Sequence, residues 1–154
     1  MLKTKITPLA LVLASLSAPA SADLIISEYI EGSSNNKAIE LYNNADTELS
    51  LEGYTLGLYS NGSSSVGNSI DLSGTLAANT TYIISNPSAD AAILDIADET
   101  STVTYYNGDD ALVLTKDGVV VDSFGQVGVD PGSFWSDDTV QTQNKTLRRK
   151  NSIT

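Results

Sequence analysis

The stretch that most constrains the fold is a predicted β-hairpin within residues 105–125, YYNGDDALVLTKDGVVVDSFG. Its two apolar runs, residues 111–114 and 119–121, flank Lys116-Asp117-Gly118. Asp-Gly between such runs favours a tight turn, because both residues tolerate a positive φ. We expect residues 107–110 to form the turn that leads into this hairpin, and the other segments to pack against it.

Further short segments predict β-strands, because β-branched and aromatic residues are concentrated in them. They lie at residues 24–30, 37–42, 49–58, 69–72, 82–84, 102–106 and 146–149. A bulge or bend is expected at Gly53, within the third segment. One helix of at most two turns is expected over residues 89–94, with Ser88 as its N-cap. This pattern predicts an all-β fold, a β-sandwich, with a closed barrel as the alternative.

Residues 1–22 have the pattern of a secretory signal peptide: two lysines, an apolar stretch (PLALVLASL) and a small-x-small cleavage site. The apolar stretch is too short to span about 30 Å of hydrocarbon, which argues against a transmembrane anchor. We therefore expect cleavage between Ala22 and Asp23. Residues 23–154 would then pass through the periplasm and be secreted, without a membrane span.

The expected mature chain is strongly acidic. The full sequence has a net charge of −11, with 8 basic and 19 acidic residues. Without Lys3 and Lys5, six basic residues remain against the same 19 acidic ones, so the net charge becomes −13. Such a surface as a whole repels nucleic acid and anionic membranes. The more common role of an acidic surface on a secreted protein is to keep the protein soluble.

The sequence contains neither cysteine nor histidine. Disulfides and Cys-ligated metal sites are thereby excluded, so the core or bound ions must hold an exported domain together. Every Ser-His triad and the commonest zinc ligand are excluded as well.

Two glutamates could form a carboxylate pair, as glycoside hydrolysis requires. Glu28 and Glu40 lie on neighbouring predicted strands. The alternative, which we favour, is that each faces solvent or that Glu40 pairs with Lys37. In so acidic a chain, two acids are weak grounds for catalysis.

Acidic pairs in loops suggest calcium, a cation that takes oxygen ligands. Asp109 and Asp110 form one such pair, and residues 137–138 form another, but neither has the spacing of a calcium-binding loop. We favour turn chemistry, in which Asp109 and Asp110 accept hydrogen bonds from backbone amides near Asn107 and Gly108.

Four of the six remaining basic residues gather near the C-terminal end of the sequence. They are Lys145, Arg148, Arg149 and Lys150. Such residues can contact the phosphates of nucleic acid. The alternative, which we favour, is an edge strand guarded by charge against pairing with other chains.

The motif order resembles that of the lamin-tail domain in its bacterial secreted form. Residues 24–43 (LIISEYIEGSSNNKAIELYN) and 107–128 (NGDDALVLTKDGVVVDSFGQVG) carry the resemblance. Residues 142–154 (TQNKTLRRKNSIT) are similar to the end region of the same module. The form in question is found at the N-terminus of extracellular endonucleases of the endonuclease/exonuclease/phosphatase type.

The resemblance implies an immunoglobulin-like β-sandwich over residues 23–154. It also implies a non-catalytic accessory module of a secreted nuclease, with the catalytic nuclease domain, extracellular DNA or the cell surface as partners. No catalytic residue carries over, because the family's catalytic residues lie in a separate domain, and no cofactor is expected in this chain. Further residues would be expected after Thr154, so we expect a fragment of a longer product. The alternatives are a standalone exported surface or matrix interaction domain, or a small hydrolase using Glu28 and Glu40.

Overall fold

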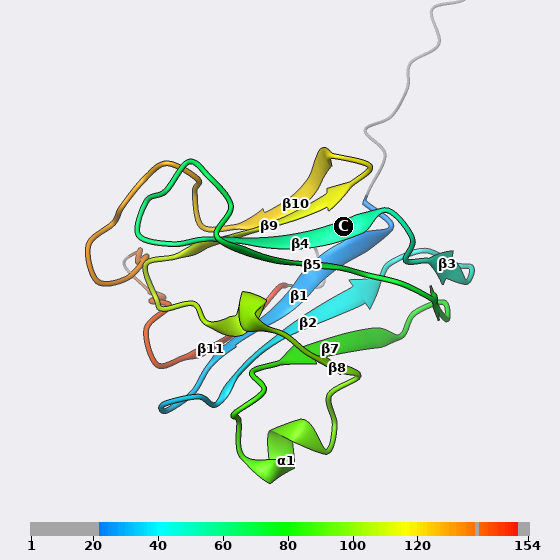
Figure 1. Ribbon diagram of the computed structural model, residues 1–154, viewed down its shortest axis with the longest axis horizontal. Helices are drawn as coiled ribbons and strands as arrows, with labels where there is room; N and C mark the ends of the chain where they lie inside the picture. Colours follow the sequence, from blue (N-terminus) through cyan, green and yellow to red (C-terminus); the bar gives the residue numbers. More distant parts are fainter. Residues whose placement is uncertain (1–21, 138, 151–154) are drawn as a thin grey trace, which may run out of the picture.

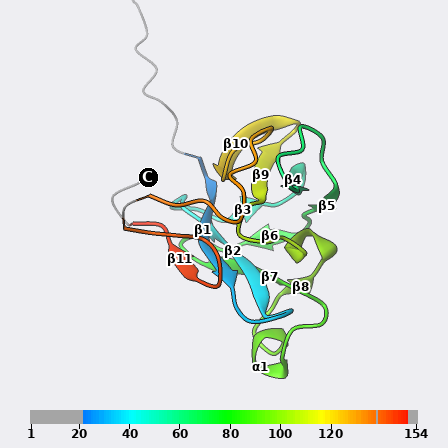
Figure 2. The same ribbon diagram turned by 90° about the vertical axis from the view of Figure 1, so that its left-hand side faces the viewer.

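The computed structural model describes residues 22–137 and 139–150, and the predicted signal peptide up to residue 21 lies outside that range. Its strands form two stacked sheets and a small two-stranded ribbon (Figure 1). Figure 2 shows the layers from the side, with β9 and β10 above β1 and β2. The fold is an immunoglobulin-like β-sandwich and not a barrel. The strand pattern predicted the sandwich, and the family resemblance implied its immunoglobulin-like form.

The first sheet has five strands in the order β11-β1-β2-β7-β8. All pairs are antiparallel except β7 and β8. The strand bounds are Leu24–Glu31 for β1, Lys37–Asn43 for β2, Thr81–Ser85 for β7, Glu99–Thr100 for β8 and Thr146–Arg148 for β11.

The second sheet has four antiparallel strands in the order β10-β9-β4-β5. Its strand bounds are Tyr54–Tyr59 for β4, Asn68–Asp71 for β5, Ala111–Lys116 for β9 and Val119–Phe124 for β10. A separate ribbon pairs β3 (Leu49–Ser50) with β6 (Thr75–Leu76). The bend expected at Gly53 is present, since this residue has φ of 80° in the turn between β3 and β4.

The core lies between the two sheets and is built from the inward side chains of both. The first sheet contributes Leu24, Ile26, Ile39, Leu41 and Ile84, all buried. The second sheet contributes Leu56, Leu58, Leu112 and Leu114, also buried. Burial of large aliphatic side chains stabilises the fold by about 1.5–3 kcal/mol each relative to exposure.

The predicted hairpin is confirmed, but only one of its strands is central. Asp117 and Gly118 have φ of 50° and 79°, the positive values that the tight turn requires. Strand β9 pairs with both β4 and β10. Strand β10 is an edge strand, and Val119 and Val120 are 67% and 61% exposed. The expectation that other segments pack against both strands holds, but on β10 only Val121, Asp122 and Phe124 make such contacts, while Val119 and Val120 face solvent.

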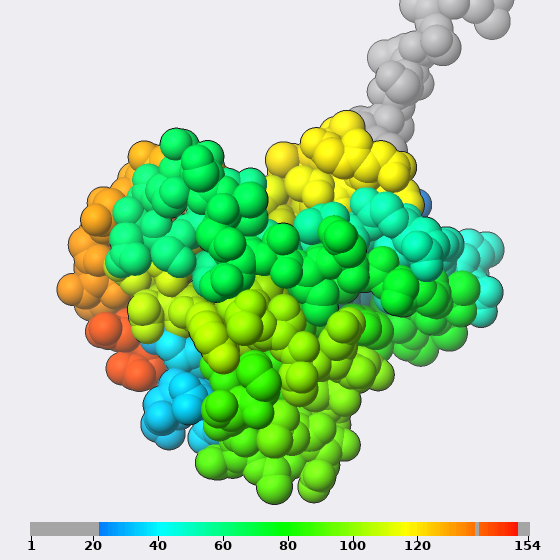
Figure 3. All heavy atoms as spheres, viewed as in Figure 1, coloured from blue at the N-terminus to red at the C-terminus, as the bar shows by residue number. Residues whose placement is uncertain are grey.

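The helix is shorter than predicted, and its N-cap was assigned wrongly. Helix α1 spans Ala91–Leu94, and its N-cap is Asp90. Ser88 lies in the preceding turn, where its amide donates to the side chain of Asn86. The side chain of Asn36 fixes the helix start instead, because it accepts from the Asp90 amide and donates to the Asp90 carboxylate. Figure 3 shows that α1 and its turns protrude from one end of the molecule.

The strand predicted over residues 102–106 is also wrong. Residues Thr102–Thr104 form a short 3₁₀ helix, and the strand of this region is β8, two residues earlier. The hydroxyl of Ser101 accepts from the amide of Val103 and starts the 3₁₀ turn. Such local side-chain bonds compete with strand pairing. Within the described residues, no helix is long and apolar enough to cross a membrane.

Candidate functional site

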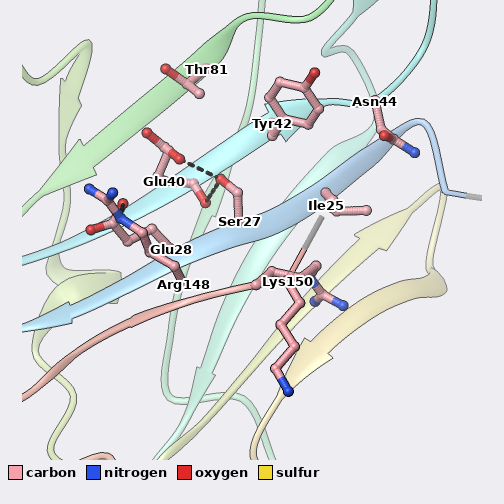
Figure 4. Close-up of a pocket in the computed structure, with 10 residues that line it drawn as sticks. Ile25, Ser27, Glu28, Glu40, Tyr42, Asn44, Thr81, Arg148 and Lys150 are labelled. Carbon is pink, nitrogen blue, oxygen red and sulfur yellow. Dashed lines mark hydrogen bonds and ion pairs between the residues drawn. The ribbon is translucent and has the colours of Figure 1, made fainter. Parts of the chain in front are cut away.

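A groove on the outer face of the five-stranded sheet is the main candidate site (Figure 4). It has a volume of about 630 Å³ and crosses β11, β1, β2 and β7. Small-molecule sites typically have volumes of about 300–1,000 Å³. The polar side chains that line it and carry the argument below are Ser27, Glu28, Glu40, Tyr42, Arg148 and Lys150.

A β-bulge in β1 gives this face its polar character. Ile26 lies opposite Leu41 and Glu28 opposite Glu40, so Ser27 is an extra residue in β1. A bulge shifts the alternation of side chains along a strand. Ile26 and Tyr29 therefore both point into the core, whereas Ser27 and Glu28, next to each other in sequence, both line the groove.

The structure brings Glu28 and Glu40 together, an arrangement that the predicted strands allowed but that we did not favour. They are direct cross-strand partners, a position in which like charges destabilise a sheet by roughly 0.2–1 kcal/mol. Arg148 offsets this repulsion, since its Nε lies 2.9 Å from Glu28 Oε2. The Ser27 hydroxyl donates to Glu40 Oε1 over 2.7 Å.

The alternative pairing of Glu40 with Lys37 is wrong. Lys37 Nζ donates to the backbone oxygen of Tyr106 and, over 3.2 Å, to Asn107 Oδ1. It also lies 5.8 Å from the centroid of the Tyr106 ring. Lys37 thus ties the start of β2 to residues 106–107 and is no part of the groove.

The basic residues near the end of the sequence have two different environments. Arg149 is enclosed: its Nη2 lies 2.7 Å from Asp122 Oδ2, and its Nε donates to the Ile26 oxygen. The Asp122 carboxylate in turn accepts from the Ile26 amide. This Asp122–Arg149 ion pair joins β10 of one sheet to β1 of the other.

Arg148, Lys145 and Lys150 are the basic residues of this segment that face solvent. The side chain of Arg148 is 78% exposed although it pairs with Glu28. Lys150 extends away from Glu40 in the view of Figure 4. The predicted nucleic-acid patch therefore retains three accessible cations, and one of them is already paired with a carboxylate.

The comparison with known families adds to this geometry. Residues 17–128 match the profile of the Lamin Tail Domain family, which is most of the chain. The chain belongs to the lamin tail domain family. No curated protein matches the sequence.

Lamin tail domains are immunoglobulin-like binding or interaction domains, which is consistent with a non-catalytic role for this chain. The match ends at residue 128. The resemblance noted for residues 142–154 therefore lies beyond the matched span, although β11 completes the first sheet of this lamin tail domain.

The predicted calcium ligand Asp110 has other partners in this lamin tail domain. Its Oδ2 accepts from the amide of Asn107 over 2.7 Å, and its Oδ1 accepts from the amide of Asn61 over 2.8 Å. Burial raises the pKa of Asp110 above its ordinary value, while these backbone bonds act in the opposite direction. Asp110 thus links two loops by accepting backbone hydrogen bonds, as the turn interpretation predicted. The same interpretation fails for Asp109, which accepts no backbone hydrogen bond in the described structure.

Of the second acidic pair, residues 137–138, only Asp137 lies within the described residues, and it stabilises a turn. Asp137 accepts from the amides of Thr139 and Val140, and the Thr139 bonds lower its pKa. Asp138 lies outside the described residues. Within them, no group of three or more acidic side chains gathers in a way that could hold a metal ion.

A cluster of three aromatic residues, of which Tyr29 and Tyr106 are buried and Phe124 is partly buried, was not predicted from the sequence. The rings of Tyr29 and Phe124 stack at 4.2 Å, and Tyr106 lies 4.7 Å from Tyr29. The Tyr29 hydroxyl donates to the buried carboxylate of Glu31 over 2.8 Å, and the Tyr106 hydroxyl donates to the oxygens of Ile30 and Ala38. Burial raises the pKa of both tyrosines well above the ordinary value.

Proposed function

We propose that this lamin tail domain is a non-catalytic binding module of an exported protein, and that it serves a secreted, metal-dependent nuclease as an accessory domain. Membership of an interaction-domain family supports the binding role. The groove over β1 and β2 is the observation that carries it, because polar side chains from four strands converge there on the outer face.

The groove suits binding better than hydrolysis. Glu28 is held by Arg148, and Glu40 is held by Ser27. Both carboxylates thus have partners that fix their positions, as in a recognition surface whose hydrogen-bonding groups are placed in advance. Metal-dependent phosphodiester cleavage uses a bound cation, which in this proposal belongs to the nuclease domain.

Export is supported by the signal-peptide pattern of residues 1–22. N-terminal sequencing of the chain recovered from the culture medium tests it. We expect a mature N-terminus at Asp23. Recovery only from the cell interior, with Met1 retained, would contradict export.

The proposed role as an accessory domain of a nuclease is supported by the order of the motifs in residues 24–43 and 107–128. This role has a test of its own. We expect the reading frame to continue past the codon for Thr154 into a domain with clustered His, Asp, Asn and Glu residues. A stop codon at that point would favour the other candidate, a standalone exported surface or matrix interaction domain, which the solvent-facing edge strand β11 also suits.

A further inference from the structure

Hydrogen-bond donors and acceptors lie side by side in the groove. The cross-strand register places Arg148 beside Glu28 and Glu28 beside Glu40. The next outward position along β2 is Tyr42, which is opposite Thr81 of β7. The groove therefore runs from a guanidinium over two carboxylates to an aromatic ring and a hydroxyl (Figure 4).

This mixture of opposite charges is unfavourable for strongly charged ligands of either sign. A polyanion attracted by Arg148 and Lys150 meets Glu28 and Glu40 within the same groove, and a polycation meets the reverse arrangement. Arg149 also lines the groove, but its charge is paired with Asp122. Like-charge contacts of this kind suppress wrong partners. Hydroxyl groups, by contrast, both donate and accept hydrogen bonds, so a neutral polyhydroxylated ligand can match both kinds of side chain.

We propose that the groove binds a neutral saccharide, an inference that rests on the proposed binding role and names its ligand class. The carboxylate of Glu40, fixed by the Ser27 hydroxyl, accepts bonds from sugar hydroxyls. Arg148 contacts Glu28 through Nε, and its exposed guanidinium offers its other N–H groups to sugar oxygens. Hydrogen bonds with one charged partner are roughly twice as strong as neutral ones.

Tyr42 supplies the apolar part of the site. Its hydroxyl donates to Asn79 Oδ1 over 3.0 Å, which fixes the ring at the rim of the groove. An aromatic ring fixed at its polar tip presents an apolar surface, against which the C–H face of a sugar ring can pack. Polar contacts from Glu40 of β2 and Arg148 of β11, with an aromatic contact from Tyr42 of β2, together define the site.

Affinity electrophoresis of the full chain tests the proposal. Native gels contain one polysaccharide each: neutral xylan, dextran or mannan, or anionic alginate. The variants Glu40→Gln and Tyr42→Ala alter the groove. Asp71→Asn is the matched control, because it also removes one negative charge but lies on β5 of the other sheet. Circular dichroism confirms that each variant is folded.

We expect retardation in at least one neutral gel. Each groove variant should weaken it about tenfold, the change that losing one hydrogen bond to a charged group or one aromatic contact produces, and Asp71→Asn should keep it. Absence of retardation in every neutral gel, retention only by alginate or by added duplex DNA, or equal retention in the groove variants would overturn the proposal. None of these results bears on the reading frame or the N-terminus, so failure here is distinguishable from failure of the accessory role.

Discussion

At the scale of single residues, Arg148 and Arg149 are neighbours in sequence with different roles. The Arg149 side chain is 25% exposed and bonded to Asp122 and to the backbone of Ile26, whereas the Arg148 side chain is 78% exposed and pairs with Glu28 on the outer face. Exposed ion pairs contribute about 0–1 kcal/mol, but removing one partner of an enclosed pair costs about 3 kcal/mol or more when burial is complete. The difference gives a direct test with an internal control.

We predict that Arg149→Ala lowers the free energy of unfolding by about 2 kcal/mol, because Asp122 then loses its counter-charge and the Ile26 oxygen loses its donor. Arg148→Ala should lower it by at most about 0.5–1 kcal/mol. Urea denaturation of the two variants measures both values. Equal losses would show that the Asp122–Arg149 ion pair does not hold the sheets together.

The buried tyrosines predict how stability depends on pH. Burial raises the pKa of Tyr29 in the folded state above the unfolded value of about 10. A raised folded-state pKa means that the stabilisation is complete below pH of about 10 and is lost as the pH rises further. Each such tyrosine contributes a slope of about 1.4 kcal/mol per pH unit in that range.

Tyr29→Phe should therefore reduce the alkaline slope by about 1.4 kcal/mol per pH unit, while lowering stability at neutral pH because Glu31 loses its donor. Chemical denaturation between pH 8 and about 12 checks this against the unsubstituted chain. An unchanged slope would mean that the Tyr29 hydroxyl reaches solvent in the native state.

At the scale of elements, the β9–β10 turn shows what can be predicted from local sequence. Asp117-Gly118 predicts a tight turn through the φ values that these residue types tolerate, and the structure has those values. Nothing lies within 4 Å of a Cβ built on Gly118, so any cost of a substitution comes from the backbone alone.

We predict that Gly118→Ala lowers the free energy of unfolding by about 1–2 kcal/mol, because alanine is strained at a φ of 79°. Gly67→Ala is the control, since its new Cβ would meet one atom at 3.7 Å, an ordinary contact, and its φ is not positive. Thermal unfolding of both variants compares them. Equal melting temperatures would contradict the assigned turn.

The bulge in β1 makes a second prediction at this scale. Deleting Ser27 would remove the extra residue but leave Ile26 opposite Leu41 and Glu28 opposite Glu40, so the remaining side chains of β1 would keep their sides of the sheet. We therefore expect the deletion variant to fold with the same core, while Glu40 loses the hydroxyl that fixes its carboxylate. Deleting Ser64, an exposed residue outside the strands, is the control and should also be tolerated. Loss of native near-ultraviolet dichroism in the Ser27 deletion alone would contradict the assigned bulge.

These elements also show where prediction from sequence ends. The strands could be predicted because β-branched residues and turn signals are local. The partners of Asp122 could not be predicted, because its contacts to Ile26 and Arg149 depend on how β10 of one sheet meets β1 and the end of β11 in the other. The bulge left one local trace: the apolar alternation of Leu24 and Ile26 resumes out of phase at Tyr29. The neighbouring strands made a Glu28–Glu40 pair conceivable, but the sequence alone favoured separate side chains, because the ion pair of Glu28 with Arg148 depends on the position of β11.

At the scale of the whole molecule, two sheets enclose the apolar core and leave a polar groove on one outer face. The edge strands β8 of one sheet and β5 of the other are short, which limits pairing with other chains at these edges. Strand β10 is the exception, with two exposed valines. Such an architecture suits a domain that binds through a surface and remains soluble.

The central claim is that this domain binds and does not catalyse. Incubation of the purified full chain with supercoiled plasmid DNA, in Mg²⁺ and separately in Ca²⁺, tests it most directly, with the Glu28→Gln/Glu40→Gln double variant alongside. We predict that the plasmid stays supercoiled with both proteins. Nicking by the unsubstituted chain that disappears in the double variant would contradict the account and make the groove an active site.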